Sequence, residues 1–216
     1  MAANQKKVDK LKKQESQATQ PDQLMNCARE IVLEVGDPKW AKEVFAKAIT
    51  ATTDFINPVD YMRQISQMVL EDLKDPVWAN EIMEKCLKSP KLETLEKFDI
   101  AYFYSQYGEP DGFHARSISI YKDLLKANLK SIEPEQFYQA ADVIFNDLND
   151  KDLTVKFLEQ AAKVSTAAWD LIFIAQRYAE LLEDKITAKR FVDLAVKACD
   201  DKDEVDSIKE QAKEFM

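Results

Sequence analysis

The sequence predicts an all-α fold, in which about five antiparallel helix pairs stack into an α-solenoid and a final helix caps the C-terminal end. Three observations predict it. One apolar stripe of helical spacing recurs at intervals of 34 to 38 residues, helix-start signals precede several copies, and all seven prolines and three glycines fall between helices or in a first turn. Such a recurrence is typical of repeat architectures, and the helix breakers interrupt none of the expected helices.

The segments GDPKWA and KDPVWA mark the starts of two equivalent helices. Asp37 and Asp75 fit the N-cap position, where a carboxylate accepts hydrogen bonds from the free N–H groups of the first turn. The proline that follows each aspartate suits the first helical position, because no N–H is needed there. Trp40 and Trp78 occupy equivalent third positions, so we expect them to pack between repeats, and we expect Trp169 to lie in the core.

The apolar stripe defines the second helix of each unit. It occupies positions 41, 44, 45 and 48 in the first unit, and it opens at Ala79, Ser117, Thr154 and Ala188 in the next four. A single amphipathic helix cannot bury its stripe alone, so a first helix precedes each copy. Its small residue stands thirteen positions earlier in four units, at Ala28, Ser66, Ala141 and Ala175. We therefore expect helix pairs from about Asp22 to Ala198 and a capping helix from about Asp203.

The third unit and the N-terminus depart from this register. GEPDGFHA lengthens the third turn, so the spacing from Ala101 to Ser117 is sixteen residues, and such insertions usually form a loop on one edge of the stack. Residues 1–20 are rich in lysine and polar side chains, which predicts a flexible basic tail. Residues 21–216 are expected to form a single helical repeat domain.

The pattern of the second helix, Ala-x-x-x-Phe-x-x-Ala, resembles the tetratricopeptide repeat and its half-a-tetratricopeptide relative over residues 22–200. The likeness rests on Gly36, Ala41, Phe45, Ala48, Tyr104 and Tyr178. The turn is about one residue longer than is usual in the family, and the period is nearer 38 than 34. The resemblance implies a right-handed superhelix whose concave groove binds peptides or helices. Stacked helix pairs present extended concave surfaces in any case, and these suit protein partners.

Composition narrows the partners. Thirty lysines and arginines stand against thirty-nine aspartates and glutamates, and the net charge of −9 disfavours direct contact with nucleic acid. A protein or peptide partner of basic or amphipathic character is expected instead. No segment approaches the ~18 continuous apolar residues of a membrane span, so no membrane association is expected. The cysteines are odd in number and widely spaced, which predicts buried thiols in a reducing compartment, the cytoplasm.

Few side chains are suited to chemistry. His114 is the only histidine, and Cys27, Cys86 and Cys199 lie on apolar helical faces, which raise the thiol pKa. The acidic segment CDDKDEVD lacks the glycine and glutamate of a calcium loop, so it is interpreted as an acidic helix start. We therefore predict no catalytic residue, no metal site and no cofactor, and we do not expect an enzyme.

The aromatic segment FDIAYFYSQY and the long turn after it are the candidate site. Tyr102, Tyr104 and Tyr107 cannot all lie on one narrow stripe, and Phe113 and His114 follow in the irregular turn. One interpretation is a central helix buried on two sides, which needs a wide apolar surface. The other is that these five residues bind a partner, because tyrosine is favoured at interface hot spots.

The expected function is a non-enzymatic interaction module, a scaffold or adaptor that holds a peptide or partner helix in its groove. Two alternatives remain. The first is a helical enzyme or enzyme subunit with its chemistry near the aromatic third repeat. The second is a scaffold in an RNA-processing complex, a role for which half-a-tetratricopeptide proteins are known as a family.

Overall fold

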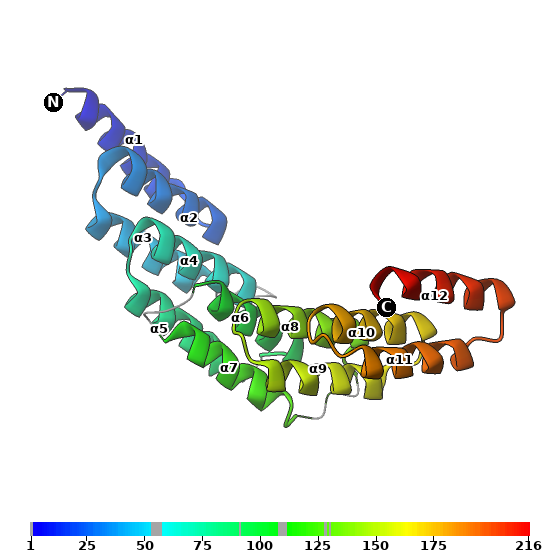
Figure 1. The fold of residues 1–216 in the computed structure, drawn as a ribbon. Coiled ribbons are helices and arrows are strands. Elements are labelled where there is room, and N and C mark those ends of the chain that lie inside the picture. Colours follow the sequence, from blue (N-terminus) through cyan, green and yellow to red (C-terminus); the bar gives the residue numbers. More distant parts are fainter. Residues whose placement is uncertain (1, 53–57, 91, 108–111, 128, 130) are drawn as a thin grey trace. The chain divides into compact units, whose positions relative to one another are not determined.

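The computed structural model describes residues 2–52, 58–90, 92–107, 112–127, 129 and 131–216, with side chains from Gln5 onward. Helices make up 82% of these residues, which contain no strand (Figure 1). The prediction of an all-α fold built from helix pairs is confirmed. The chain divides into two compact units, Met1–Glu96 and Lys97–Met216. The single domain expected over residues 21–216 stays a prediction.

The first unit holds two of the expected pairs and one additional helix. Its elements are α1 (Ala2–Gln17), α2 (Pro21–Glu30), the π turn η1 (Ile31–Val35), α3 (Pro38–Ala51), α4 (Pro58–Asp72) and α5 (Pro76–Leu87). Helix α2, continued by η1, packs on α3, and α4 packs on α5. Helices α2 and α3 both contact α4, so the pairs are stacked, and α1 packs on α2.

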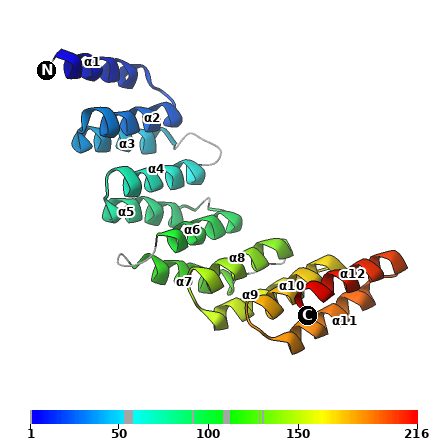
Figure 2. The ribbon, with the colours of Figure 1, turned by 45° about the horizontal axis from the view of Figure 1, so that its top comes forward.

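The second unit holds three pairs and the capping helix. Its elements are α6 (Thr94–Gln106, which starts in the first unit), α7 (Phe113–Leu124), α8 (Pro134–Asn146), α9 (Lys151–Val164), α10 (Ala168–Glu180), α11 (Lys185–Ala198) and α12 (Lys202–Phe215). Helix α12 lies against both α10 and α11 (Figure 2). The expected cap is therefore confirmed.

The small residues that define the repeat lie on the faces that the paired helices bury. All ten are completely buried: Ala28 and Ala41, Ser66 and Ala79, Ala101 and Ser117, Ala141 and Thr154, and Ala175 and Ala188. In two of these pairs, one hydrogen bond also joins the two residues. The Ser66 hydroxyl donates to the Ala79 carbonyl at 2.8 Å, and the Ser117 hydroxyl donates to the Ala101 carbonyl at 2.7 Å. The third helix pair, α6 and α7, keeps this contact despite its longer turn.

Four turns within pairs share one backbone conformation. The residue before the N-cap aspartate is left-handed in each, with φ of 72° at Gly36, 54° at Lys74, 53° at Asn149 and 56° at Glu183. In the last three, the aspartate N–H donates to the carbonyl six residues earlier, one residue farther than in a Schellman motif. The same aspartate then caps the next helix. Asp37 and Asp75 accept from Trp40 N and Trp78 N, both at 3.0 Å, which confirms the predicted helix starts.

The N-terminal segment differs from the flexible tail that its composition predicts. Residues 2–17 form α1, and Leu11 is only 1% exposed within the core of the first unit. Glu15 accepts a hydrogen bond from Trp40 Nε1 at 2.8 Å and pairs with Lys47. Burial opposes the charge of Glu15, but the bonds from Lys47 and Trp40 outweigh it and lower the pKa of this carboxyl.

The tryptophans of the first unit lie at the edge of its core, where repeats meet. Trp40 and Trp78 are half-buried and pack against the buried cluster of α2 to α5. The Lys42 ammonium, from α3, lies 4.7 Å from the ring centroid of Trp78 and 2.6 Å from the Asp75 carboxylate. These contacts confirm packing between repeats. Trp169 is half-buried rather than fully in the core.

Candidate functional site

A hollow of about 230 Å³ opens in the second unit between α6, α7 and α8. Its lining consists of Phe98, Asp99 and Tyr102 from α6, Tyr121 from α7, and Gln136, Gln139, Ala140 and Val143 from α8. The hollow therefore lies in the third helix pair and the first helix of the next, where the sequence placed its candidate site.

Aromatic rings form the floor of the hollow. Phe98 is 5% exposed, and its ring stands edge-on to those of Tyr121 and Phe137, with centroids 6.4 and 5.9 Å apart. Phe157 of α9 lies beneath, 5.4 Å from Tyr121 and 6.3 Å from Phe98. Edge-to-face contacts of this kind hold rings in defined orientations. The floor is consequently rigid and apolar.

The rim of the hollow is polar and accessible. The side chain of Tyr102 is 45% exposed and stands one helical turn after Phe98, so both residues share one face of α6. Asp99 adds a carboxylate from α6, and Gln139 of α8 is exposed opposite, with its amide bonded to Glu135 at 2.8 Å. A hollow with an apolar floor, an exposed tyrosine and a few polar groups is suited to hold one side chain of a ligand.

The phenol of Tyr121 stays protonated in this setting. Burial raises its pKa well above the usual range, and the carboxylates of Asp147 and Asp99 raise it further. A tyrosine with such a pKa offers a neutral hydroxyl rather than a base at ordinary pH. The floor of the hollow is therefore uncharged.

The structure divides the five predicted site residues into two groups. Tyr102 alone lines the hollow. Tyr104 and Phe113 are 0% and 2% exposed, and their rings meet edge to face with centroids 5.1 Å apart. Tyr107 is half-buried, with its ring 5.1 Å from that of Phe103. This cluster joins α6 to the start of α7, as expected of a helix buried on two sides.

His114 tethers the start of α7 to the end of α6. Its Nε2 lies 2.9 Å from the Ser105 carbonyl, and since a carbonyl oxygen only accepts, Nε2 carries the proton and donates. The Ser105 hydroxyl in turn donates to the Tyr102 carbonyl at 2.8 Å. Asp147, after α8, accepts from Gln106 at 2.8 Å. The histidine is thus held by the backbone of the third pair.

Sequence reasoning missed most of the residues that line the hollow. Phe98 opened the aromatic segment already singled out, and its four-residue spacing from Tyr102 was a signal that the two share a face. Tyr121 belonged to the apolar stripe of α7. The α8 residues Gln136 and Gln139 carried no signal, because their place beside Tyr102 depends on how α8 packs on α6.

Other reactive groups are held in unreactive forms. Burial raises the pKa of the Cys27 thiol, and it raises the pKa of Cys86 to about 12, as the apolar faces predicted. In the described part of the chain, no three histidine, cysteine or carboxylate side chains are grouped as metal ligands. The acidic segment near the C-terminus starts α12, with the Asp201 carboxylate accepting from Asp203 N at 2.8 Å.

The fold and the hollow define an all-α protein of successive helix pairs with an aromatic-floored depression in the third pair. None of the helices in the described residues is long and apolar enough to cross a membrane. Comparison with known proteins finds no matching family model, no matching curated protein and no matching solved structure.

Proposed function

We propose that this chain is a non-enzymatic scaffold or adaptor that binds a peptide or partner helix, with the α6–α8 hollow receiving one apolar side chain of the partner. The observation that carries the proposal is the exposed Tyr102 at the rim of a floor made by Phe98 and Tyr121. Tyrosines with one apolar face and a free edge are frequent anchors at interfaces. The hollow is about the size that a single large side chain fills, which favours recognition of a short motif.

Two further observations support recognition rather than chemistry. The high pKa of Tyr121 keeps its hydroxyl neutral, so this group is suited to hydrogen bonding and not to taking a proton. The net charge of −9 attracts basic segments at long range. A partner with an apolar anchor next to lysine or arginine fits both features.

We also propose that the repeats are tetratricopeptide-like. Support comes from the complete burial of Ala28 and Ala41 and of Ala175 and Ala188, which stand thirteen positions apart in paired helices. Small residues stand at the equivalent positions of the tetratricopeptide pattern that the sequence resembles. The free, buried thiols of Cys27 and Cys86 favour a reducing compartment such as the cytoplasm.

The proposal is tested by selecting 12-residue peptides from a random library on the purified chain and measuring their affinities by calorimetry. We expect selected peptides to share a large apolar residue beside a basic one. Tyr102→Ala should weaken their binding at least about tenfold, the effect of losing one hot-spot anchor. Ile186→Ala is the matched control, because this side chain is 87% exposed on α11 and outside the hollow.

Two results would contradict the proposal. The first is that no peptide is enriched over an unrelated helical protein. The second is that Tyr102→Ala and Ile186→Ala bind the selected peptides equally well. Circular dichroism of both variants checks that the helices are intact.

A further inference from the structure

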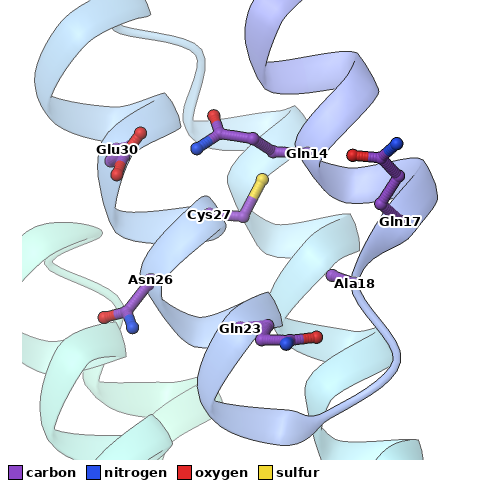
Figure 3. A pocket seen from close by; sticks show the side chains of 7 residues that line it. All are labelled: Gln14, Gln17, Ala18, Gln23, Asn26, Cys27 and Glu30. Carbon is purple, nitrogen blue, oxygen red and sulfur yellow. The ribbon is translucent and has the colours of Figure 1, made fainter.

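A second, chemically different pocket lies in the first unit between α1 and α2. It has a volume of about 300 Å³ and is lined by Gln14, Gln17, Ala18, Gln23, Asn26, Cys27 and Glu30. Figure 3 shows the α1 and α2 side chains arranged around the Cys27 thiol, with Glu30 and Gln23 at opposite ends of the α2 wall. On α2 the lining residues recur every three or four positions, so they form one continuous helical face.

Two oxygens of this pocket are buried without a hydrogen-bond donor. Gln14 Oε1 and Glu30 Oε2 have no partner in the described part of the chain. Both atoms are acceptors, and one belongs to a carboxylate. Buried polar atoms are nearly always paired, because leaving one unpaired is costly, and the cost is greatest for a charged group. The pocket is therefore built to receive hydrogen-bond donors.

Two lysines of the first unit are engaged elsewhere. Lys47 pairs with Glu15, and Lys7 lies 3.3 Å from Glu34. No lysine or arginine is among the lining residues. The only other titratable group is the Cys27 thiol, whose pKa burial raises, so it stays neutral and directs its hydrogen toward the Leu11 carbonyl, 3.7 Å away. Glu30 is thus the one charge that lines the pocket.

We propose that this pocket binds the ammonium or guanidinium group of a lysine or arginine side chain of a partner protein. Such a group carries several donors and no acceptor, so it can bond Gln14 Oε1 and Glu30 Oε2 together and neutralise the carboxylate. Gln17 and Asn26 at the mouth offer amides to the partner's backbone. The backbone departs from α-helical geometry directly after Glu30, in the π turn η1, and such turns are frequent at functional sites.

This site goes beyond the α6–α8 hollow and does not depend on it. It lies in the first unit, and it recognises charge where the hollow recognises an apolar side chain. The chain would then bind a basic side chain in the α1–α2 pocket and an apolar side chain in the α6–α8 hollow.

The test is an NMR titration of the ¹⁵N-labelled full chain with the capped tripeptide acetyl-Ala-Lys-Ala-amide. The matched probe replaces lysine with norleucine, which keeps the length and removes the charge. We expect the lysine peptide to shift the side-chain amide of Gln14 and the backbone amides of Cys27 and Glu30, and the norleucine peptide to leave them in place. Glu30→Gln should weaken the lysine peptide at least about tenfold.

Glu43→Gln is the control for charge, because Glu43 is exposed on α3 of the same unit and its loss changes the net charge equally. Tyr102→Ala separates the two proposals, since it removes the α6–α8 anchor and should leave these shifts unchanged. Equal shifts with norleucine, equal affinity of Glu30→Gln and Glu43→Gln, or no shift at millimolar peptide would each overturn the inference and indicate a pocket that holds water only.

Discussion

The two compact units fill their cores with different side chains. Among the described residues of Met1–Glu96, Phe45 is the one aromatic ring that is fully buried, and Trp40 and Trp78 lie at the core edge. In Lys97–Met216 every helix from α6 to α12 contributes buried rings: Phe98, Phe103, Tyr104, Phe113, Tyr121, Phe137, Tyr138, Phe157, Tyr178, Phe191 and Phe215. One repeat pattern therefore supports two kinds of packing.

The difference explains why each unit carries its own kind of pocket. Rings that meet edge to face keep fixed orientations, and between α6, α7 and α8 they form an apolar floor. Aliphatic and small side chains fill the first unit, and the surface between α1 and α2 is completed by amides and Glu30. The chemistry of a pocket thus follows from which residues occupy the faces beside the repeat stripe.

The sharpest test of the comparison is to remove one ring from each core. Phe157 contacts the rings of Phe98, Tyr121 and Phe137, whereas the ring of Phe45 meets no other ring among the described residues. Phe157→Ala should cost about 4–5 kcal/mol of unfolding free energy, and Phe45→Ala about 3–4 kcal/mol, because only the first also loses ring–ring contacts. Urea unfolding followed by circular dichroism measures both.

The partly exposed Phe173 supplies the control for these variants. Phe173→Ala should cost less than either, since this residue stays 38% exposed and less of its ring surface leaves water on folding. If Phe45→Ala proved as costly as Phe157→Ala or more so, the ring network would add nothing to the second core, and the comparison would fail.

A second test asks whether α1 belongs to the first core. Leu11 is the one described α1 residue that is fully buried, so Leu11→Ala should cost about 2–3 kcal/mol of unfolding free energy. Leu33→Ala is a matched control, because that leucine is 68% exposed, and its cost should stay within about 0.5 kcal/mol. A cost equally small for Leu11→Ala would show that residues 2–17 leave the core in solution, as the predicted tail requires.

The helix pairs could be predicted because their signals are local. Small residues thirteen positions apart, such as Ala28 and Ala41, mark the faces that two paired helices bury, and the Asp-Pro segments mark helix starts. Helix α1 could not be predicted in this way. Its single buried leucine stands among lysines, and the contacts that place it, Glu15 with Trp40 and Lys47, join residues 25 and more positions apart.

The candidate site was predicted only in part for a related reason. The third unit and Tyr102 were identified from aromatic density and the broken register. The set that completes the hollow depends on the rotation of α6 and on which α8 residues face it, and no pattern within a single helix encodes either. The pocket at Glu30 could not be predicted for the same reason. Its defining feature is that no neighbouring helix supplies a hydrogen-bond donor to Glu30 Oε2.

A third prediction compares two N-cap aspartates, one in each unit, by how their contributions to stability depend on pH. The hydrogen bonds from the Lys42 ammonium and the Trp78 N–H lower the pKa of the Asp75 carboxyl, whereas hydrogen bonds from Thr187 lower the pKa of the Asp184 carboxyl in the second unit. A carboxyl with a lowered folded pKa stabilises the protein above its unfolded pKa of about 4, and this contribution is lost as pH falls through the folded value.

The Asp75→Asn variant isolates that charge, since asparagine caps helices equally well. We expect it to cost about 0.5–1 kcal/mol at pH 7, and the difference from the parent chain should vanish below about pH 3. Lys42→Met should remove the same contribution, so the double variant should lose no more than either single one. Additive losses would mean that Lys42 and Asp75 act independently. Urea midpoints between pH 3 and pH 7 report the result.

An effect of similar size tests what the units share, the left-handed turn before the capping aspartate. Lys74 in the first unit and Glu183 in the second hold φ values of 54° and 56°, which disfavour any residue with a Cβ by about 1–2 kcal/mol. Glycine removes that strain but adds chain entropy to the unfolded state, so Lys74→Gly and Glu183→Gly should each stabilise by about 0.5–1 kcal/mol.

Gly36→Ala is the reciprocal control: a Cβ there meets no atom within 4 Å, so its cost would come from the backbone alone. Thermal or urea midpoints should rise for both glycine variants and fall for Gly36→Ala. Equal gains in the two units would show that the turn acts independently of the core beside it, whereas a gain in one unit alone would mean that the core sets the turn.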